Sequence, residues 1–180
     1  MKYIQLILIS FTIVAAGCTS NQSTNTEAQE NTMEASTDAA DSTATDGVKF
    51  KSKGIQTIYG AYEKLRDALV ATDFETAKTF AAELSEALKA DESTMQQASF
   101  ADDILNAGEI EAARAVFSEL NNSMESVFEG AVVSGEINKC FCPMALDNTG
   151  ASWFTSGKEI LNPYFGDKML KCGSIKKTIK

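Results

Sequence analysis

Apolar residues recur at steps of three and four through most of residues 55–132, and no proline interrupts the chain before Pro143. Steps of three and four place apolar side chains along one stripe of an α-helix. Proline breaks helices because it lacks a backbone N–H and clashes with the preceding turn. This part of the chain therefore predicts a series of amphipathic helices.

Four helical segments are predicted, and the second opens on the capping-box sequence Thr72-Asp73-Phe74-Glu75. The segments cover about 54–71, 72–89, a short stretch within 91–107, and 109–132. Short connections favour antiparallel packing of neighbouring helices. The predicted fold class is mainly α, an up-and-down bundle of about four helices.

The composition changes after Gly135, because both prolines, the single tryptophan and three of the four cysteines lie beyond it. Closely spaced glycine, proline and asparagine are typical of turns. We expect a Cys/Met-rich, turn-rich segment after the bundle, with short strands near 137–141 and 174–179. The aromatic stretch between these strands is predicted as a loop.

The first residues have the features of a secretory signal rather than of a folded segment. Lys2 precedes a short apolar run, and small residues lead directly to Cys18, as in a bacterial lipobox. The sequence predicts a lipoprotein signal peptide over 1–17. It then predicts a lipidated Cys18 with an acidic, Ser/Thr-rich tether over 18–48, which should contact nothing, and a folded domain over 49–180.

Sulfur-bearing side chains form two pairs, Cys142 with Met144 and Met169 with Cys172. Spacings of two at a strand end and of three on a helical turn each aim two side chains the same way. Thiolate and thioether ligands together select Cu(I), or its analogue Ag(I). The chain contains no histidine, so an ordinary zinc site is not expected.

A disulfide is the alternative role for these cysteines. An exported chain meets an oxidising compartment, where Cys142 or Cys140 would pair with Cys172 across a loop of about thirty residues. The methionines would then fill gaps in the packing. Spacing alone leaves the metal site and the disulfide both open. A redox-active Cys140-Phe141-Cys142 is disfavoured, because its spacer is one residue and no βαβ pattern accompanies it.

Composition also limits the classes of function. The formal net charge of −9 argues against binding nucleic acid or anionic lipid through charge. Without histidine there is no Ser-His or Cys-His nucleophile pair, and no glycine-rich phosphate loop occurs. We therefore predict a protein that is not an enzyme.

The C-terminal segment also carries a long motif of the form CPM, GAxW and NPYFGxxMxxCG, which resembles a bacterial domain of unknown function. That domain occurs alone in secreted proteins and lipoproteins of Bacteroidetes-type bacteria, and at the C-terminus of periplasmic adaptor subunits of copper and silver efflux pumps. The resemblance extends over about 55–178. The motif matches Cys142-Pro143-Met144, Gly150-Ala151-Ser152-Trp153 and Asn162-Pro163-Tyr164-Phe165-Gly166 with Met169 and Cys172-Gly173.

The resemblance implies a copper-handling domain whose metal ligands are Cys142, Met144, Met169 and Cys172. Cys140 departs from the motif and is a candidate fifth sulfur or a competing disulfide partner. The expected protein is a periplasm-facing lipoprotein of the bacterial cell envelope, anchored in the membrane through Cys18. It would buffer Cu(I) or Ag(I) or deliver the ion to heavy-metal efflux components. Trp153 or Phe165 is expected to cover the site.

Overall fold

The computed structural model describes residues 47–180. The predicted signal peptide, the lipidated Cys18 and nearly all of the predicted tether lie outside these residues. The domain starts one residue earlier than predicted, because Val48 is buried in the core and its carbonyl accepts a hydrogen bond from Gln56 Nε2 (3.3 Å). The prediction that the whole of 19–48 contacts nothing is therefore wrong at Val48.

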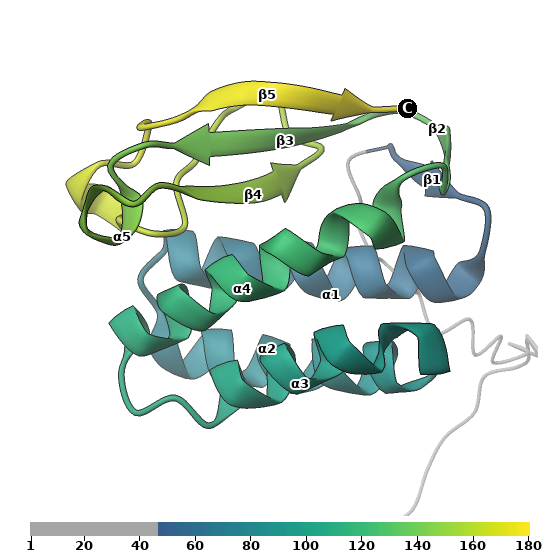
Figure 1. The fold of residues 1–180 in the computed structure, drawn as a ribbon, viewed down its shortest axis with the longest axis horizontal. Coiled ribbons are helices and arrows are strands. Elements are labelled where there is room, and N and C mark those ends of the chain that lie inside the picture. Colours follow the sequence, from purple (N-terminus) through teal and green to yellow (C-terminus); the bar gives the residue numbers. More distant parts are fainter. Residues whose placement is uncertain (1–46) are drawn as a thin grey trace, which may run out of the picture. The chain divides into compact units, whose positions relative to one another are not determined.

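Four α-helices form the larger part of the domain and confirm the predicted mainly-α bundle. Neighbours in sequence pack side by side, and α1 and α4 lie between the α2–α3 pair and a small sheet (Figure 1). Their apolar stripes meet in one core. The helices are α1 (Lys53–Val70), α2 (Phe74–Lys89), α3 (Met95–Leu105) after a 3-10 turn η1 (Glu92–Thr94), and α4 (Ile110–Phe128).

The cap of α2 differs from the predicted capping box. Asp73, rather than Thr72, is the N-cap residue, and its carboxylate accepts a hydrogen bond from the backbone N–H of Thr76 (3.1 Å). Thr72 is left-handed (φ 58°) and its hydroxyl accepts from Arg114 Nη2 (3.1 Å). The N-cap thus lies one residue later than predicted, and α2 begins at Phe74, because Thr72 belongs to the turn that receives Arg114.

Helix α4 ends at Phe128 and does not reach Val132 as predicted. Gly130 follows with φ 67°, a left-handed conformation that glycine adopts without steric cost and that ends the helix. Val132–Ser134 instead forms β2, which pairs antiparallel with β1 (Lys49–Phe50). The prediction extended the helix because apolar residues continue past Gly130, but the backbone changes direction at this glycine.

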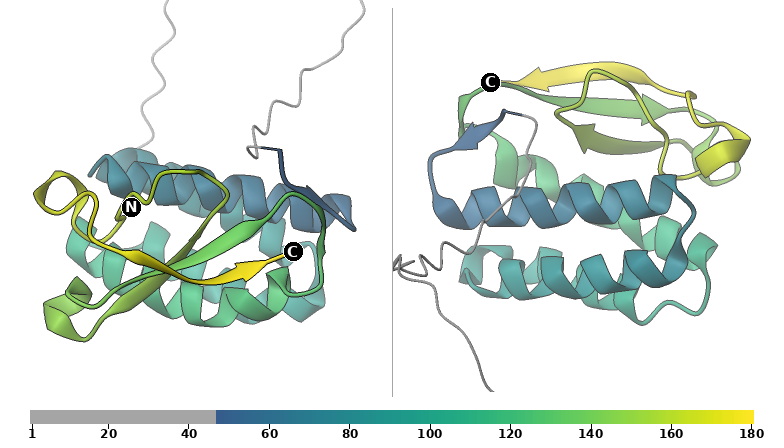
Figure 2. Two further views of the ribbon diagram at one scale, coloured as in Figure 1. Left: turned by 90° about the horizontal axis from the view of Figure 1, so that it is seen from above. Right: turned by 180° about the vertical axis from the view of Figure 1, so that it is seen from behind.

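The C-terminal segment forms a three-stranded antiparallel sheet in the order β4-β3-β5 (Figure 2). The strands are β3 (Ile137–Cys142), β4 (Ala151–Thr155) and β5 (Ser174–Ile179). The two predicted strands are confirmed. The aromatic stretch that was predicted as a loop contains β4, whose Trp153 pairs with Cys140 of β3.

Buried polar side chains join the outer edge of β4 to the helices. The Tyr62 hydroxyl accepts from the backbone N–H of Phe154 (2.9 Å) and donates to Asn121 Oδ1 (2.6 Å). The Tyr164 hydroxyl donates to the Ser152 carbonyl (2.5 Å). Edge strands leave backbone groups unpaired, so these hydroxyls supply the partners that a further strand would otherwise provide.

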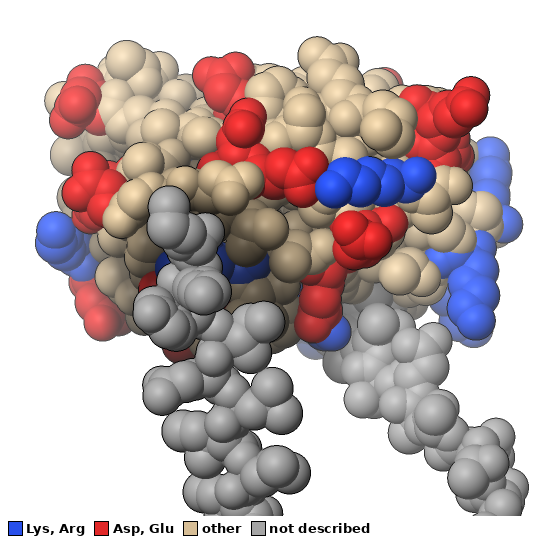
Figure 3. All heavy atoms as spheres, turned by 90° about the horizontal axis from the view of Figure 1, so that it is seen from below, with Lys and Arg blue, Asp and Glu red and all other residues tan. Residues whose placement is uncertain are grey.

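The face formed by α2 and α3 carries more carboxylates than lysines (Figure 3). Its exposed acids include Glu75, Glu83, Glu86 and Asp103. None of the helices in residues 47–180 has the length and apolar character needed to cross a membrane. Among residues 47–180, the side of the bundle that faces away from the sheet is therefore acidic.

Candidate metal centre

Cys142 and Cys172 meet at one end of the sheet, although thirty residues separate them in the chain. Their Sγ atoms are 2.6 Å apart, and both thiols are free. This separation is longer than a disulfide bond, which is about 2.05 Å. Cys142 is fully buried and Cys172 is half-buried, so one side of the pair is accessible. The contact with Cys142 raises the pKa of the Cys172 thiol.

Cys142 is held in place because it is the last residue of β3, paired with Ala151 of β4. Beyond it, a left-handed turn at Leu146–Asn148, with φ between 49° and 67°, returns the chain to β4. Gly150 closes the turn with φ 83°, and a Cβ there would lie 2.4 Å from the Phe141 ring. A side chain at position 150 would collide with the Phe141 ring, so the turn that follows Cys142 and Met144 requires glycine there.

Asn162 fixes the backbone of Cys172 through a side-chain hydrogen bond. The sequence had indicated only that a turn lies in this region. Its side chain is fully buried, and Nδ2 donates to the Cys172 carbonyl (2.9 Å). Its Oδ1 accepts from the backbone N–H of Tyr164 (2.8 Å), and its own N–H donates to the Leu170 carbonyl (2.7 Å). One asparagine therefore closes 162–172 into a loop and sets where Cys172 lies.

The same loop is fastened to the bundle by Arg114, a buried residue of α4 that sequence reasoning missed. Arg114 Nε donates to the Pro163 carbonyl (2.8 Å), and Nη2 donates to the Leu69 carbonyl (2.9 Å) at the end of α1. Gly166, in the loop, has φ 53°, and a Cβ there would lie 2.1 Å from Thr72 Oγ1. The second sulfur pair is thus positioned by the turn between α1 and α2.

The two methionines lie between the two cysteines along the chain. Met144 is 46% exposed and precedes the short α5 (Ala145–Asn148), while Met169 is half-buried and follows the 3-10 turn η2 (Gly166–Lys168). The Met169 carbonyl accepts from the Cys172 N–H (3.0 Å). Within residues 47–180, no group of three or more His, Cys, Asp or Glu side chains is arranged to hold a metal ion. A coordination number above two at this pair would need ligands of another kind, such as the thioethers of Met144 and Met169.

Cys140 shares the sheet face of Cys142, because residues two apart on a strand point the same way. It pairs with Trp153 on β4 and Ile175 on β5 and is fully buried. Burial raises the pKa of its thiol to about 11. Cys140 is therefore a protonated core residue at neutral pH.

Cys140 is expected to resist alkylation in the folded, reduced protein, whereas Cys172 should react. Iodoacetamide attacks the thiolate, and at pH 8 only about one Cys140 thiol in a thousand is ionised, given a pKa of about 11. Peptide mapping by mass spectrometry after a timed reaction measures each site. Denatured protein is the control, in which both residues should react. Equal labelling of Cys140 and Cys172 in the native protein would contradict the burial of Cys140.

Trp153, one of the two residues predicted to cover the site, is fully buried. A Cβ at Gly173, the neighbour of Cys172, would lie 2.5 Å from the indole Cη2 atom. Phe165, the other predicted cover, is half-buried and lines a cavity of about 450 Å³ together with Leu146 and Lys168. The indole is therefore the aromatic group that packs directly on the Cys172–Gly173 backbone.

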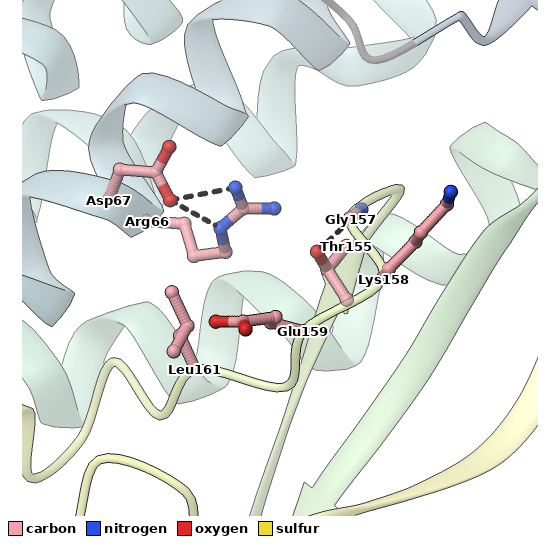
Figure 4. Close-up of a pocket in the computed structure, with 7 residues that line it drawn as sticks. All are labelled: Arg66, Asp67, Thr155, Gly157, Lys158, Glu159 and Leu161. Carbon is pink, nitrogen blue, oxygen red and sulfur yellow. Dashed lines mark hydrogen bonds and ion pairs between the residues drawn. The ribbon is translucent and has the colours of Figure 1, made fainter.

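A separate cavity of about 450 Å³ has a charged lining (Figure 4). Arg66 donates to Asp67 through Nη2 (2.7 Å) and to the buried Glu63 through Nη1 (3.2 Å). Glu63 also accepts from the Ser156 hydroxyl (2.7 Å). Glu63 is thus a buried carboxylate on a helix, held by Arg66 and Ser156. Since these groups already pair with one another, the cavity is a weaker candidate site than the cysteine pair.

Comparison with known proteins relates only the helical part of the chain to a family. A family described as "Protein of unknown function (DUF3347)" matches residues 58–135. No curated protein matches the chain. No solved structure matches it either. The matched range ends before β3, so it contains neither Cys142 nor Cys172.

Proposed function

We propose that this protein binds one monovalent soft metal ion, Cu(I) or Ag(I), between the thiolates of Cys142 and Cys172. Met144 and Met169 supply thioether ligands. The observation that carries the proposal is the convergence of two free thiols at the accessible end of the sheet, each with a methionine two or three residues away. In this proposal the protein buffers or transfers the ion and is not an enzyme.

The donor set fits a soft ion because thiolate and thioether sulfurs favour Cu(I) over harder cations. With metal–sulfur bonds of about 2.3 Å, two thiolates on a tetrahedral ion lie roughly 3.8 Å apart. The sulfurs, now 2.6 Å apart, would separate by about 1 Å to admit the ion. Cys172 can supply this movement, since it lies in an irregular segment and is half-buried. Met144 is exposed, so its side chain can turn toward the ion without being removed from the hydrophobic core.

The proposed setting is the bacterial cell envelope. A lipid anchor at Cys18 and the acidic segment that follows it would hold the domain near the membrane, facing the periplasm. An accessible ion with sulfur ligands exchanges readily with another sulfur site. Heavy-metal efflux components are therefore the partners proposed to receive it.

Titration of the reduced full chain with Ag(I), in competition with a chelator of known affinity, tests the proposal. One ion should bind per chain. Cys142→Ser and Cys172→Ser should each weaken binding by about 100-fold, and Met144→Leu with Met169→Leu together by about 10-fold, by analogy with metal-site substitutions. Each change removes sulfur donors that the remaining ligands do not replace.

Cys140→Ala is the matched control, because it removes a thiol from the same strand and leaves the proposed ligands in place. Its Ag(I) affinity should stay within about twofold of the unchanged protein. If Cys142→Ser and Cys140→Ala bind Ag(I) equally well, the proposed ligand assignment is wrong.

A structural disulfide between Cys142 and Cys172 is the second candidate, favoured by the same close approach of the two sulfurs. The domain would then be a noncatalytic interaction module with a loop of thirty residues closed by the bond. Metal-free protein purified from the cell envelope is alkylated under denaturing conditions, so that burial does not protect Cys142, and peptide mapping then separates the two candidates. Two alkylatable thiols at these positions support metal binding, whereas complete protection that is lost on reduction supports the disulfide.

A further inference from the structure

The indole N–H of Trp153 is unusual among the buried polar groups of this protein. Among residues 47–180, Trp153 Nε1 and Gln97 Oε1 are the two buried side-chain polar atoms without a hydrogen-bond partner. Burying a donor without an acceptor costs free energy, so buried indole N–H groups usually find a partner. The position of Trp153 suggests where an acceptor can be found.

Trp153 points to the sheet face that carries the cysteines. It pairs directly with Cys140, and the next pair on the same face is Cys142 with Ala151. The indole packs on the segment that carries Cys172, since a Cβ at Gly173 would lie 2.5 Å from Cη2 and 3.2 Å from Cζ2. Cζ2 and Nε1 are attached to the same ring carbon. The benzo-ring edge of the indole therefore lies against the backbone next to Cys172, and the ring carbon that carries Nε1 adjoins this edge.

We propose that Trp153 is a positioning residue of the sulfur site, whose Nε1–H donates a hydrogen bond to a cysteine sulfur once the Cys142–Cys172 pair holds a metal ion as thiolates. This inference rests on the metal binding proposed above. A thiolate sulfur is a stronger acceptor than a thiol, because it carries a negative charge. The bond therefore forms in the loaded state and not in the free thiol state.

Such a bond would orient the ligand and stabilise the loaded state. Hydrogen bonds to metal ligands from the surrounding residues fix ligand geometry, and their loss typically weakens metal affinity by about 10- to 100-fold. Trp153 is suited to this role because it is fully buried and packs at 6.1 Å, centroid to centroid, on Tyr164. The indole cannot turn away from the cysteines without disrupting the core.

Trp153 is the only tryptophan in the chain, so its indole gives a single N–H signal in a nitrogen–proton correlation spectrum. The full chain, kept reduced, is titrated with Ag(I) while this signal is followed. We expect the signal to move downfield and to saturate at one equivalent, as a new hydrogen bond forms. In Cys142→Ser the shift should be lost. Trp153→Phe, which keeps an aromatic ring and removes the donor, should bind Ag(I) about 10-fold more weakly.

The outcomes separate this inference from the proposed function. If one Ag(I) binds with sulfur ligands while the indole N–H signal stays in place, the role of Trp153 is wrong and metal binding stands. If no Ag(I) binds tightly, the proposed function fails and this inference fails with it. The spectrum uses the unchanged protein, so the test holds even if Trp153→Phe does not fold.

Discussion

Arg114→Met is expected to lower the free energy of unfolding by about 4 kcal/mol, because it leaves buried acceptors without a donor. Arg114 is 5% exposed and donates to the Pro163 and Leu69 carbonyls and to the Thr72 hydroxyl. Methionine fills much of the same volume but offers no hydrogen bond. Urea unfolding followed by far-UV circular dichroism measures the change.

Lys64→Met is the matched control for this substitution. Lys64 also carries one positive charge and pairs with Glu83 (3.0 Å), but both side chains are more than 40% exposed. Exposed ion pairs contribute about 0–1 kcal/mol, so this variant should stay within about 1 kcal/mol of the unchanged protein. Arg114→Lys should also destabilise, because an ammonium group cannot reach all three acceptors in the geometry of a guanidinium. Equal stability of Arg114→Met and Lys64→Met would show that the loop does not depend on Arg114.

Asn162→Ala is expected to cost about 3 kcal/mol in stability and to weaken Ag(I) binding about 10-fold. The substitution removes the donor to the Cys172 carbonyl and the acceptor for the Tyr164 N–H, both in a buried setting. Cys172 then loses the contact that fixes its backbone near Cys142. Chemical unfolding and the competitive Ag(I) titration measure the two effects separately.

Asn106→Ala provides the comparison for the loss of an asparagine side chain. Asn106 is exposed and makes one hydrogen bond, to the Asp102 carbonyl (2.7 Å). Its loss should cost no more than about 1 kcal/mol and leave Ag(I) affinity unchanged. If Asn162→Ala weakens folding but binds Ag(I) as tightly as the unchanged protein, Asn162 supports the loop without positioning the site.

The helices were predictable because apolar periodicity reports local burial. Each predicted helix is present, and α1 and α2 agree with prediction to within about two residues at each end. The errors occur where a single residue changed the backbone direction. Gly130 ends α4 early, and Thr72 serves Arg114 instead of capping α2. Strand β4 was missed because its aromatic residues follow a polar turn that ends at Gly150 and resemble a loop in composition.

The candidate site was only partly predictable. Sulfur spacing identified Cys142 and Cys172 as partners, but it could not separate Cys140 from Cys142, which lie two residues apart on the same face. Both are fully buried, and they differ in their neighbours: Cys142 meets Cys172, whereas Cys140 pairs with Trp153 of β4 and Ile175 of β5. Arg114 and Asn162 were missed because each makes contacts with residues far along the chain or with backbone groups, which leave no sequence pattern.

The sequence by itself determined the helical elements, the change to a turn-rich C-terminal segment, and the residue types available to hold a soft ion. Those properties depend on periodicity and composition, which act over short distances along the chain. The tertiary structure decided which cysteines meet, that Cys172 alone of the three in residues 47–180 is partly exposed, and what holds them. Thirty residues separate Cys142 from Cys172, and their approach depends on buried hydrogen bonds from Asn162 and Arg114, whose partners are backbone carbonyls that every residue carries.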